Sequence, residues 1–204
     1  VMGRSAERGG ARVAALQAAG GRAAFGPVEA TDPASLVAAR RTAEERLGPV
    51  TVLVNAPGVN SSTPFLEISL DEWRRILDAN LTSVFLACQV FGRSMIANGL
   101  GGSIINLSSI AAQATDYPTV AYKISKAGMI AYIEQIARQF AGDGVRANVI
   151  LPGLMGSLLG RPRKGGVLWF NPLAVAAGQL PRLALPQAGT PVTALGVMPF
   201  VYLR

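Results

Sequence analysis

Apolar positions with a helical period alternate along the chain with short apolar runs of the length of a β-strand. The helical patterns predict helices over residues 5–19, 32–47, 69–97 and 119–140. The short runs predict strands over residues 22–28, 50–54, 103–107 and 145–151, and residues 1–4 resemble the end of a further strand. The run at 50–54 is rich in β-branched residues, which is typical of a strand buried on both faces. Alternating helices and strands favour a parallel sheet covered by helices.

Local signals mark where the predicted helices begin and end. Gly20 follows the first helix, and glycine readily adopts the positive φ that many helix C-termini require. Asp32 and Pro33 are typical of an N-cap and of a first helical position. Ser69 and Glu72 have the spacing of a capping box, which predicts that a long helix begins there. With right-handed crossovers, this order of elements predicts an α/β fold, a doubly wound parallel sheet of the Rossmann-like kind.

We expect this sheet to be incomplete at its first strand and at its last. No Gly-rich phosphate loop precedes residues 1–4, and an opening strand, turn and helix would take about 30 residues. Six of the 13 prolines fall in residues 161–204, which contain no acidic residue and no sustained period. The sequence therefore predicts a Rossmann-like core over residues 1–160 and an atypical Pro/Gly-rich basic tail over residues 161–204. A divergent end and a shifted reading frame both fit such a tail.

The composition excludes several kinds of chemistry. The 204 residues include no histidine, which excludes Ser-His-Asp hydrolysis and His-ligated zinc, and we expect no metal site. Any proton transfer must then use Tyr, Lys, Asp or Glu. The single cysteine, Cys88, lies in an apolar helical stretch and is predicted to be a small buried hydrophobic residue. With no intrachain disulfide and no signal-peptide pattern, the sequence favours a cytoplasmic protein.

The net charge of +7 is unevenly distributed. Residues 1–143 hold 13 basic and 12 acidic side chains, whereas residues 144–204 hold six basic and no acidic ones. Only Arg161, Arg163 and Lys164 form a basic cluster, which is too small for a nucleic-acid-binding surface. No stretch of the tail reaches the length of a membrane span without interruption. We therefore expect neither nucleic acid nor a membrane as a partner.

Two reactive side chains lie four residues apart in the last predicted helix. The spacing of Tyr122 and Lys126 places both on one helix face. A nearby ammonium favours the phenolate form of a tyrosine, so the phenol can donate a proton to a carbonyl or accept one from an alcohol. Ser109 follows the strand at 103–107 and lies 13 residues before Tyr122. The three side chains together predict a site for acid–base chemistry.

These three residues resemble the catalytic set of the short-chain dehydrogenase/reductase family, a serine followed by Tyr-x-x-x-Lys at the same interval. The resemblance implies an NAD(P)-dependent oxidoreductase that interconverts a carbonyl and a secondary alcohol in a small-molecule substrate. Tyr122 would be the general acid or base, and Ser109 would hydrogen-bond the reacting oxygen. Lys126 would assist the phenol and hold the nicotinamide ribose, so Tyr122 and Lys126 both count as cofactor contacts.

Further motifs extend the resemblance over roughly residues 1–157. Asn80 matches the family's helix asparagine, which would anchor a water in a proton relay with Lys126. The family's Asn-Asn-Ala-Gly loop corresponds to residues 55–58, with two central substitutions, and its later Pro-Gly pair also has a match. The cofactor contacts implied by these motifs are Asn55, Ala56, Gly58, Pro152, Gly153 and Ser157.

The choice between the two dinucleotides is indicated by residues 1–4, which correspond to the end of the family's second strand. In the family an acidic residue there accompanies NAD, whereas Gly-Arg accompanies the 2′-phosphate of NADP. Gly3 and Arg4 are of the second type, so NADP is slightly favoured over NAD. Glu29 stands where the family commonly has an aspartate near the adenine.

A second hypothesis remains open, namely a catalytically inactive remnant of the family or a module for oligomerisation and interaction. The phosphate loop and the final strand of the family have no counterpart in the sequence, and the loop supplies backbone N–H groups to the pyrophosphate. Relatives commonly pair through their two long helices. The resemblance therefore also implies a homo-oligomer, either a dimer or a tetramer.

Overall fold

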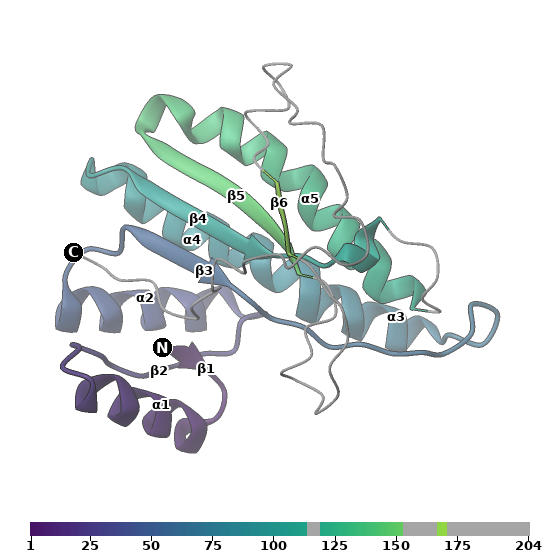
Figure 1. Cartoon of the computed structure of the whole chain (residues 1–204), viewed down its shortest axis with the longest axis horizontal. Helices are drawn as coiled ribbons and strands as arrows, with labels where there is room; N and C mark the ends of the chain where they lie inside the picture. The colour runs from purple at the N-terminus through teal and green to yellow at the C-terminus, as the bar shows by residue number, and fades with distance from the viewer. Residues whose placement is uncertain (114–118, 153–166, 171–204) are drawn as a thin grey trace, which may run out of the picture.

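A computed structural model describes residues 1–113, 119–152 and 167–170 of the chain (Figure 1). Its α-helices are α1 (Ala6–Ala18), α2 (Pro33–Leu47), α3 (Leu70–Leu77), α4 (Ser83–Asn98) and α5 (Val120–Phe140). Its strands are β1 (Met2–Gly3), β2 (Gly26–Pro27), β3 (Val52–Asn55), β4 (Gly102–Leu107), β5 (Val145–Pro152) and β6 (Val167–Phe170). Three short helical segments complete the fold, η1 (Asp78–Thr82), η2 (Ile110–Ala112) and η3 (Ala141–Asp143).

The described strands form two sheets instead of the single sheet that the sequence predicts. Strands β1 and β2 make a parallel pair, and β3, β4, β5 and β6 make a four-stranded sheet in that order. Helices connect the parallel strands, so the α/β, Rossmann-like class is confirmed. In the part of the chain that the structure describes, β1 pairs only with β2, and β3 pairs only with β4. No described strand therefore joins the two sheets into one.

The last described strand corrects one expectation about the tail. The sequence predicts no regular element within residues 161–204, yet β6 lies there and pairs antiparallel with β5, with Phe170 opposite Val149. A four-residue apolar run is long enough for a short strand. Pairing with the edge of β5 supplies the hydrogen bonds that stabilise it, and such pairing cannot be detected from local periodicity. The division into a core over 1–160 and a tail over 161–204 stays a prediction.

The four-stranded sheet carries the hydrophobic core on one face. Helices α2, α4 and α5 contribute side chains to a cluster with the inward-facing residues of β3, β4 and β5. Phe91 of α4, Met129 of α5 and Ile104 of β4 are almost entirely buried in it. Val54 of β3 points to the opposite face and is 42% exposed, so the prediction of a strand buried on both faces is wrong. Helices cover one face only of β3 in the described residues.

The predicted helix ends agree well with the structure. Asp32 caps α2 by accepting from the N–H groups of Ala34 and Ser35, and Gly20 after α1 has a φ of 82°. The long helix predicted over 69–97 is present, but it contains the π-helical segment η1 between α3 and α4. A π-helical segment widens the helix locally and is often found at functional sites.

The two-stranded sheet is a smaller unit at the N-terminal end of the molecule, where α1 lies against it (Figure 1). Gly9 of α1 allows this approach, because a Cβ at this position would lie 2.1 Å from the ring of Phe25. The N-terminal ammonium of Val1 donates to the carbonyl of Ala24 at 2.9 Å. Close backbone approach and main-chain hydrogen bonds therefore hold this unit together.

Candidate active site

The carboxyl ends of the parallel strands of the larger sheet lie along one edge. Asn55 of β3 pairs in register with Asn106 of β4, and Leu107 of β4 pairs with Ile150 of β5. In open α/β sheets ligands bind outside this edge. The loop after β3, the end of β4 and the first turns of α5 meet there, because Lys126 of α5 donates to Pro57 of the loop and to Leu107 at the end of β4.

Lys126 is the centre of this arrangement. Its side chain is 3% exposed, and its Nζ donates to the carbonyl oxygens of Leu107 at 2.9 Å and Pro57 at 3.1 Å. The same Nζ lies 5.7 Å from the centroid of the Tyr122 ring. Burial lowers the pKa of Lys126 to about 8, because a desolvated ammonium is less stable than a solvated one. The predicted pairing of Tyr122 with Lys126 is therefore present as a close contact.

Ser109 follows β4 and begins the short helical turn η2. Its Oγ accepts a hydrogen bond from the N–H of Ala111 at 3.1 Å, which fixes the position of the oxygen. A serine hydroxyl carries one hydrogen and two lone pairs, so Ser109 can still donate to a further oxygen. The neighbouring Ser108 donates to the main-chain carbonyl of Lys126 at 2.8 Å, which ties the end of β4 to α5.

Asn80 lies inside η1 and is fully buried. Its Oδ1 accepts from the N–H of Val59 at 2.7 Å, and its Nδ2 donates to the carbonyl of Val59 at 2.8 Å and to Ser125 Oγ at 3.1 Å. The side-chain amide is thus occupied by protein partners. The proton relay through Asn80 stays a prediction.

The side chain of Asn55 points into the interior of the molecule. Its Nδ2 donates to Oδ1 of Asn106 at 2.8 Å and lies 3.5 Å from the sulfur of Cys88. Asn106 in turn donates to the hydroxyl of Tyr132 at 3.0 Å. Burial raises the pKa of Cys88 to about 11 and also raises the pKa of Tyr132. Cys88 is buried as predicted, and a cofactor contact by Asn55 could use only its main chain.

The remaining cofactor positions are placed in different parts of the chain. Ala56 and Gly58 are exposed in the loop after β3, and Pro152 ends β5. Gly153 and Ser157 lie outside the described residues.

Arg4 and Glu29 lie just beyond the carboxyl ends of β1 and β2, on the smaller sheet. A hydrogen bond from the hydroxyl of Thr31, 2.9 Å long, is the main cause of the lowered pKa of Glu29, and the charge of Arg4 contributes less. The structure therefore gathers Ser109, Tyr122, Lys126 and Asn80 around the larger sheet and places these two charged residues on the other one.

Several parts of the site could not be recognised in the sequence. Ser125 is fully buried, accepts from Asn80 and donates to the main-chain carbonyl of Tyr122 at 2.7 Å. Its only sequence signal is a hydroxyl three residues after the tyrosine on a helix. The two acceptors of Lys126 are main-chain carbonyls, and a carbonyl leaves no signal in the residue type.

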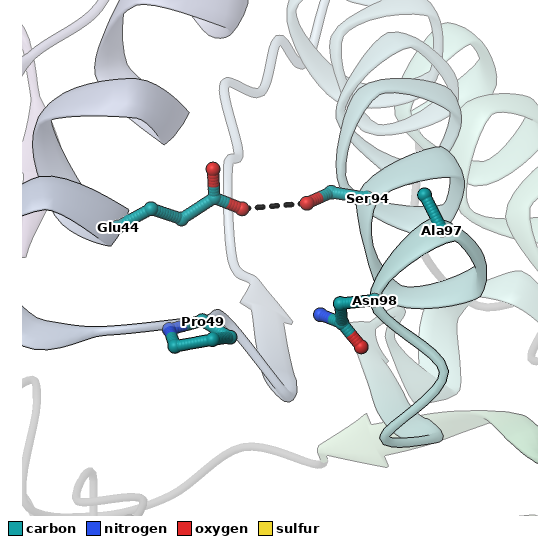
Figure 2. A pocket seen from close by; sticks show the side chains of 5 residues that line it. All are labelled: Glu44, Pro49, Ser94, Ala97 and Asn98. Carbon is teal, nitrogen blue, oxygen red and sulfur yellow. Dashed lines mark hydrogen bonds between the residues drawn. The ribbon is translucent and has the colours of Figure 1, made fainter.

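A separate pocket of about 350 Å³ lies at the amino end of β3, away from this edge (Figure 2). It is lined by Glu44, Pro49, Ser94, Ala97 and Asn98, and Ser94 donates to Glu44 at 2.5 Å. It contains none of the predicted site residues. Within residues 1–113, 119–152 and 167–170, no three His, Cys, Asp or Glu side chains are grouped so that they could hold a metal ion. None of the helices described there is both long enough and apolar enough to span a membrane.

The Rossmann-like sheet carries Ser109, Tyr122 and Lys126 at its carboxyl edge. The family model for short chain dehydrogenases matches residues 1–164, and the chain belongs to this family. A D-threitol dehydrogenase from Mycolicibacterium smegmatis is 37% identical over 153 residues, which are 74% of this chain and 58% of that protein. The inactive 2-(S)-hydroxypropyl-CoM dehydrogenase 2 of Xanthobacter autotrophicus is 33% identical over 167 residues, 76% of this chain and 72% of that protein.

Solved structures have the same fold. A short chain dehydrogenase from Mycobacterium smegmatis superposes with a TM-score of 0.73 and 28% identity, and the match covers 87% of this chain and 70% of that one. A gluconate 5-dehydrogenase from Burkholderia cenocepacia, crystallised with NADP and tartrate, has a TM-score of 0.71 and 26% identity, covering 75% and 60%. The chain spans about three fifths of the length of several of these relatives.

Proposed function

We propose that this chain carries the catalytic half of an NAD(P)-dependent oxidoreductase that interconverts a carbonyl and a secondary alcohol. The observation that carries the proposal is the buried ammonium of Lys126, which contacts the ring of Tyr122 at the carboxyl edge of the sheet. A phenol beside a buried cation is a suitable group for donating a proton to a carbonyl or accepting one from an alcohol.

Each residue of the group has a separate task in this mechanism. Tyr122 passes a proton to the carbonyl oxygen during reduction and accepts it from the alcohol during oxidation. Ser109 donates a hydrogen bond to the same oxygen and holds it in place, since its Oγ is already fixed by Ala111. Lys126 stabilises the charge that develops on Tyr122. Asn80 holds the loop that supplies one acceptor of Lys126.

The donors present fit a nicotinamide nucleotide. An ammonium has three N–H groups, and the carbonyls of Leu107 and Pro57 accept from two of those of Lys126, so the third can reach a ribose hydroxyl. The nicotinamide ring, when bound, supplies or accepts the hydride. Main-chain groups beside the ring come from the exposed Ala56 and Gly58 and from Pro152 at the end of β5. Tyr122 gives a second contact to the ribose. Asn55, Gly153 and Ser157 complete the proposed set.

The preference for NADP over NAD is part of the proposal. Arg4 is exposed at the carboxyl end of β1, where it can pair with a 2′-phosphate. A gluconate 5-dehydrogenase of similar fold was crystallised with NADP, which supports the same choice. Glu29 would contact the adenine end. Its carboxylate is held by Thr31, so it can accept from a ribose hydroxyl without moving.

Two measurements test the enzyme. Titration of the purified chain with NADPH and NADH, followed by the fluorescence of the reduced nicotinamide, should show saturable binding. Oxidation of NADPH in the presence of a panel of ketones and aldehydes should then depend on Tyr122. Absence of any change in NADPH fluorescence at millimolar concentration would rule out an active enzyme.

The resemblance also leads us to propose a homo-oligomer. Phe85 of α4 and Ile124 of α5 are large apolar side chains that are 45% and 43% exposed on two long helices. Paired helices from a second copy would bury them. Light scattering of the wild-type chain and of Phe85→Asp should give a dimer or larger for the first and a monomer for the second.

The second candidate is an inactive member of the family that serves in association. The name of one relative describes it as inactive, and the described residues form a sheet in two separate parts. An oligomeric chain that binds neither nucleotide would favour this candidate. We also retain a cytoplasmic location as a prediction, on the basis of the single buried thiol of Cys88.

A further inference from the structure

A single carboxylate holds the loop between β3 and α3. Glu72 lies in the first turn of α3, and its Oε1 accepts from the hydroxyls of Ser61 and Thr63, the second at 2.8 Å. The N–H of Thr63 donates to Ser61 Oγ at 3.1 Å, so the two hydroxyl residues are also bound to each other. The loop is therefore folded back onto the beginning of the helix.

This use of Glu72 differs from the one that its position predicts. In a capping box the glutamate returns to the N–H of the N-cap residue. Here Ser69 does accept from the N–H of Glu72 at 3.1 Å, which is half of the box. The carboxylate of Glu72 bonds instead to the loop hydroxyls. The side chain of Glu72 therefore bonds to the loop and not to the N-cap at the beginning of α3.

The same loop supplies two main-chain contacts to the candidate active site. The carbonyl of Pro57 accepts from Lys126 at 3.1 Å. The N–H and the carbonyl of Val59 both bond to the side chain of Asn80. A shift of this segment would therefore remove one acceptor from Lys126 and both main-chain partners from Asn80.

We propose that Glu72 is a positioning residue that fixes loop residues 57–63 and, through them, the surroundings of Lys126 and Asn80. In this role Glu72 acts through the loop and does not touch substrate or cofactor. The link to hydride transfer rests on the proposed function, whereas the anchoring of the loop does not. Strand β3 fixes one end of this loop. Glu72, 15 residues after Pro57 in the sequence, fixes the loop at a second point.

Three variants separate the anchor from other roles of the side chain. Glu72→Ala removes both acceptor oxygens. Glu72→Gln keeps one carbonyl oxygen that can accept from Ser61 and Thr63. Asp71→Ala is the matched control, because it removes a carboxylate from the same helical turn, and that side chain is 97% exposed. The control accounts for the charge at the N-terminus of α3.

Amide hydrogen exchange, measured by NMR, gives a readout that does not need activity. The N–H of Val59 reports on the loop, and the amides of β4 report on global unfolding. Both hydroxyls lose their charged acceptor, so Glu72→Ala should accelerate exchange at Val59 at least about tenfold. Glu72→Gln should recover most of the protection, Asp71→Ala should leave it unchanged, and β4 should not respond in any variant.

Two results would overturn the proposal. One is unchanged exchange at Val59 in Glu72→Ala. The other is an equal acceleration at Val59 and in β4, which would make Glu72 a contributor to global stability alone. Turnover of the same variants tests the link to catalysis. If the wild-type chain has no turnover, the proposed function fails while the exchange result still decides the anchor. If it has turnover, Glu72→Ala should lower kcat and Glu72→Gln should restore most of it.

Discussion

The two sheets of the molecule differ in how firmly they are packed. Strands β3, β4 and β5 have four to eight residues each and share a continuous core with α2, α4 and α5. Strands β1 and β2 have two residues each, and Gly9 is the single buried residue of α1. The larger sheet therefore has both the longer hydrogen-bonded ladders and the greater burial of apolar surface.

This difference matches the chemistry proposed for each part. Proton transfer requires groups held within a few tenths of an ångström, which packed strands and helices can provide. Tyr122 and Lys126 stand on a helix of the larger unit. Recognition of a phosphate by an exposed arginine tolerates more movement, and Arg4 belongs to the smaller unit. Catalysis and cofactor choice should therefore respond separately to substitutions.

The largest effect is expected from Tyr122→Phe in the larger unit. The substitution keeps the ring and removes the acidic hydroxyl, so turnover should fall by about 10²–10⁴-fold, the usual contribution of a general acid or base. Cofactor affinity should fall much less than turnover, because only one hydroxyl contact to the ribose is lost. Steady-state oxidation of NADPH, with binding measured separately, checks both statements. Turnover that survives at the wild-type rate would exclude Tyr122 as the acid.

Matched truncations compare the packing of the two units. Phe91 is 1% exposed in the main core, and Phe91→Ala should lower the free energy of unfolding by about 3–5 kcal/mol. Phe25 is only partly buried against Gly9, so Phe25→Ala should lower it by about 1–2 kcal/mol. Urea denaturation gives both values. Equal losses would mean that the smaller unit is as well packed as the larger one.

The buried ammonium of Lys126 should make stability depend on pH. Its pKa falls from 10.5 to about 8 on folding because burial desolvates it, so the unfolded chain binds more protons between these values. The free energy of unfolding should therefore rise with pH across this window, on the order of 1–3 kcal/mol. Urea denaturation of the wild type and of Lys126→Met, compared across this pH range, isolates the contribution of the Lys126 ammonium. An identical pH dependence of the two proteins would show that Lys126 keeps its ordinary pKa.

The smallest effect is expected from Arg4→Ala in the smaller unit. Loss of one exposed charged contact to a phosphate should weaken NADPH binding about tenfold, corresponding to about 1.4 kcal/mol. NADH binding and the fold should be unaffected. Arg12→Ala is the control, since this exposed arginine lies further along α1. Equal weakening of NADPH and NADH by Arg4→Ala would contradict a role in selecting the 2′-phosphate.

Most of the helices and strands follow from sequence patterns. Periodicity and caps such as Asp32 act over a few residues, so the helix ends could be placed closely. The spacing of Tyr122 and Lys126 already puts both on one helix face. Neither the π-helical turn around Asn80 nor the bond of this side chain to Val59, 21 residues away in sequence, could be foreseen, because local periodicity carries no signal of either.

The partners of Asn55 could not be predicted from the sequence. Its side chain is turned inward to Asn106. A two-residue periodicity gives the alternation of a strand, and only packing decides which partners a buried amide finds. Arg4 and Glu29 lie beside the smaller sheet, whereas Lys126 lies on α5, which packs against the larger one.

Residue identities and their local spacing are sufficient to predict the α/β class, the helix caps and the reactive group of Ser109, Tyr122 and Lys126, because each of these depends on neighbours within a few turns. The fold alone established that Lys126 is buried under two main-chain carbonyls, that Asn80 is occupied by the loop, and that Glu72 anchors this loop. These contacts join segments that are distant in the chain. They arise when packing removes polar groups from water and each one must find a partner in the protein.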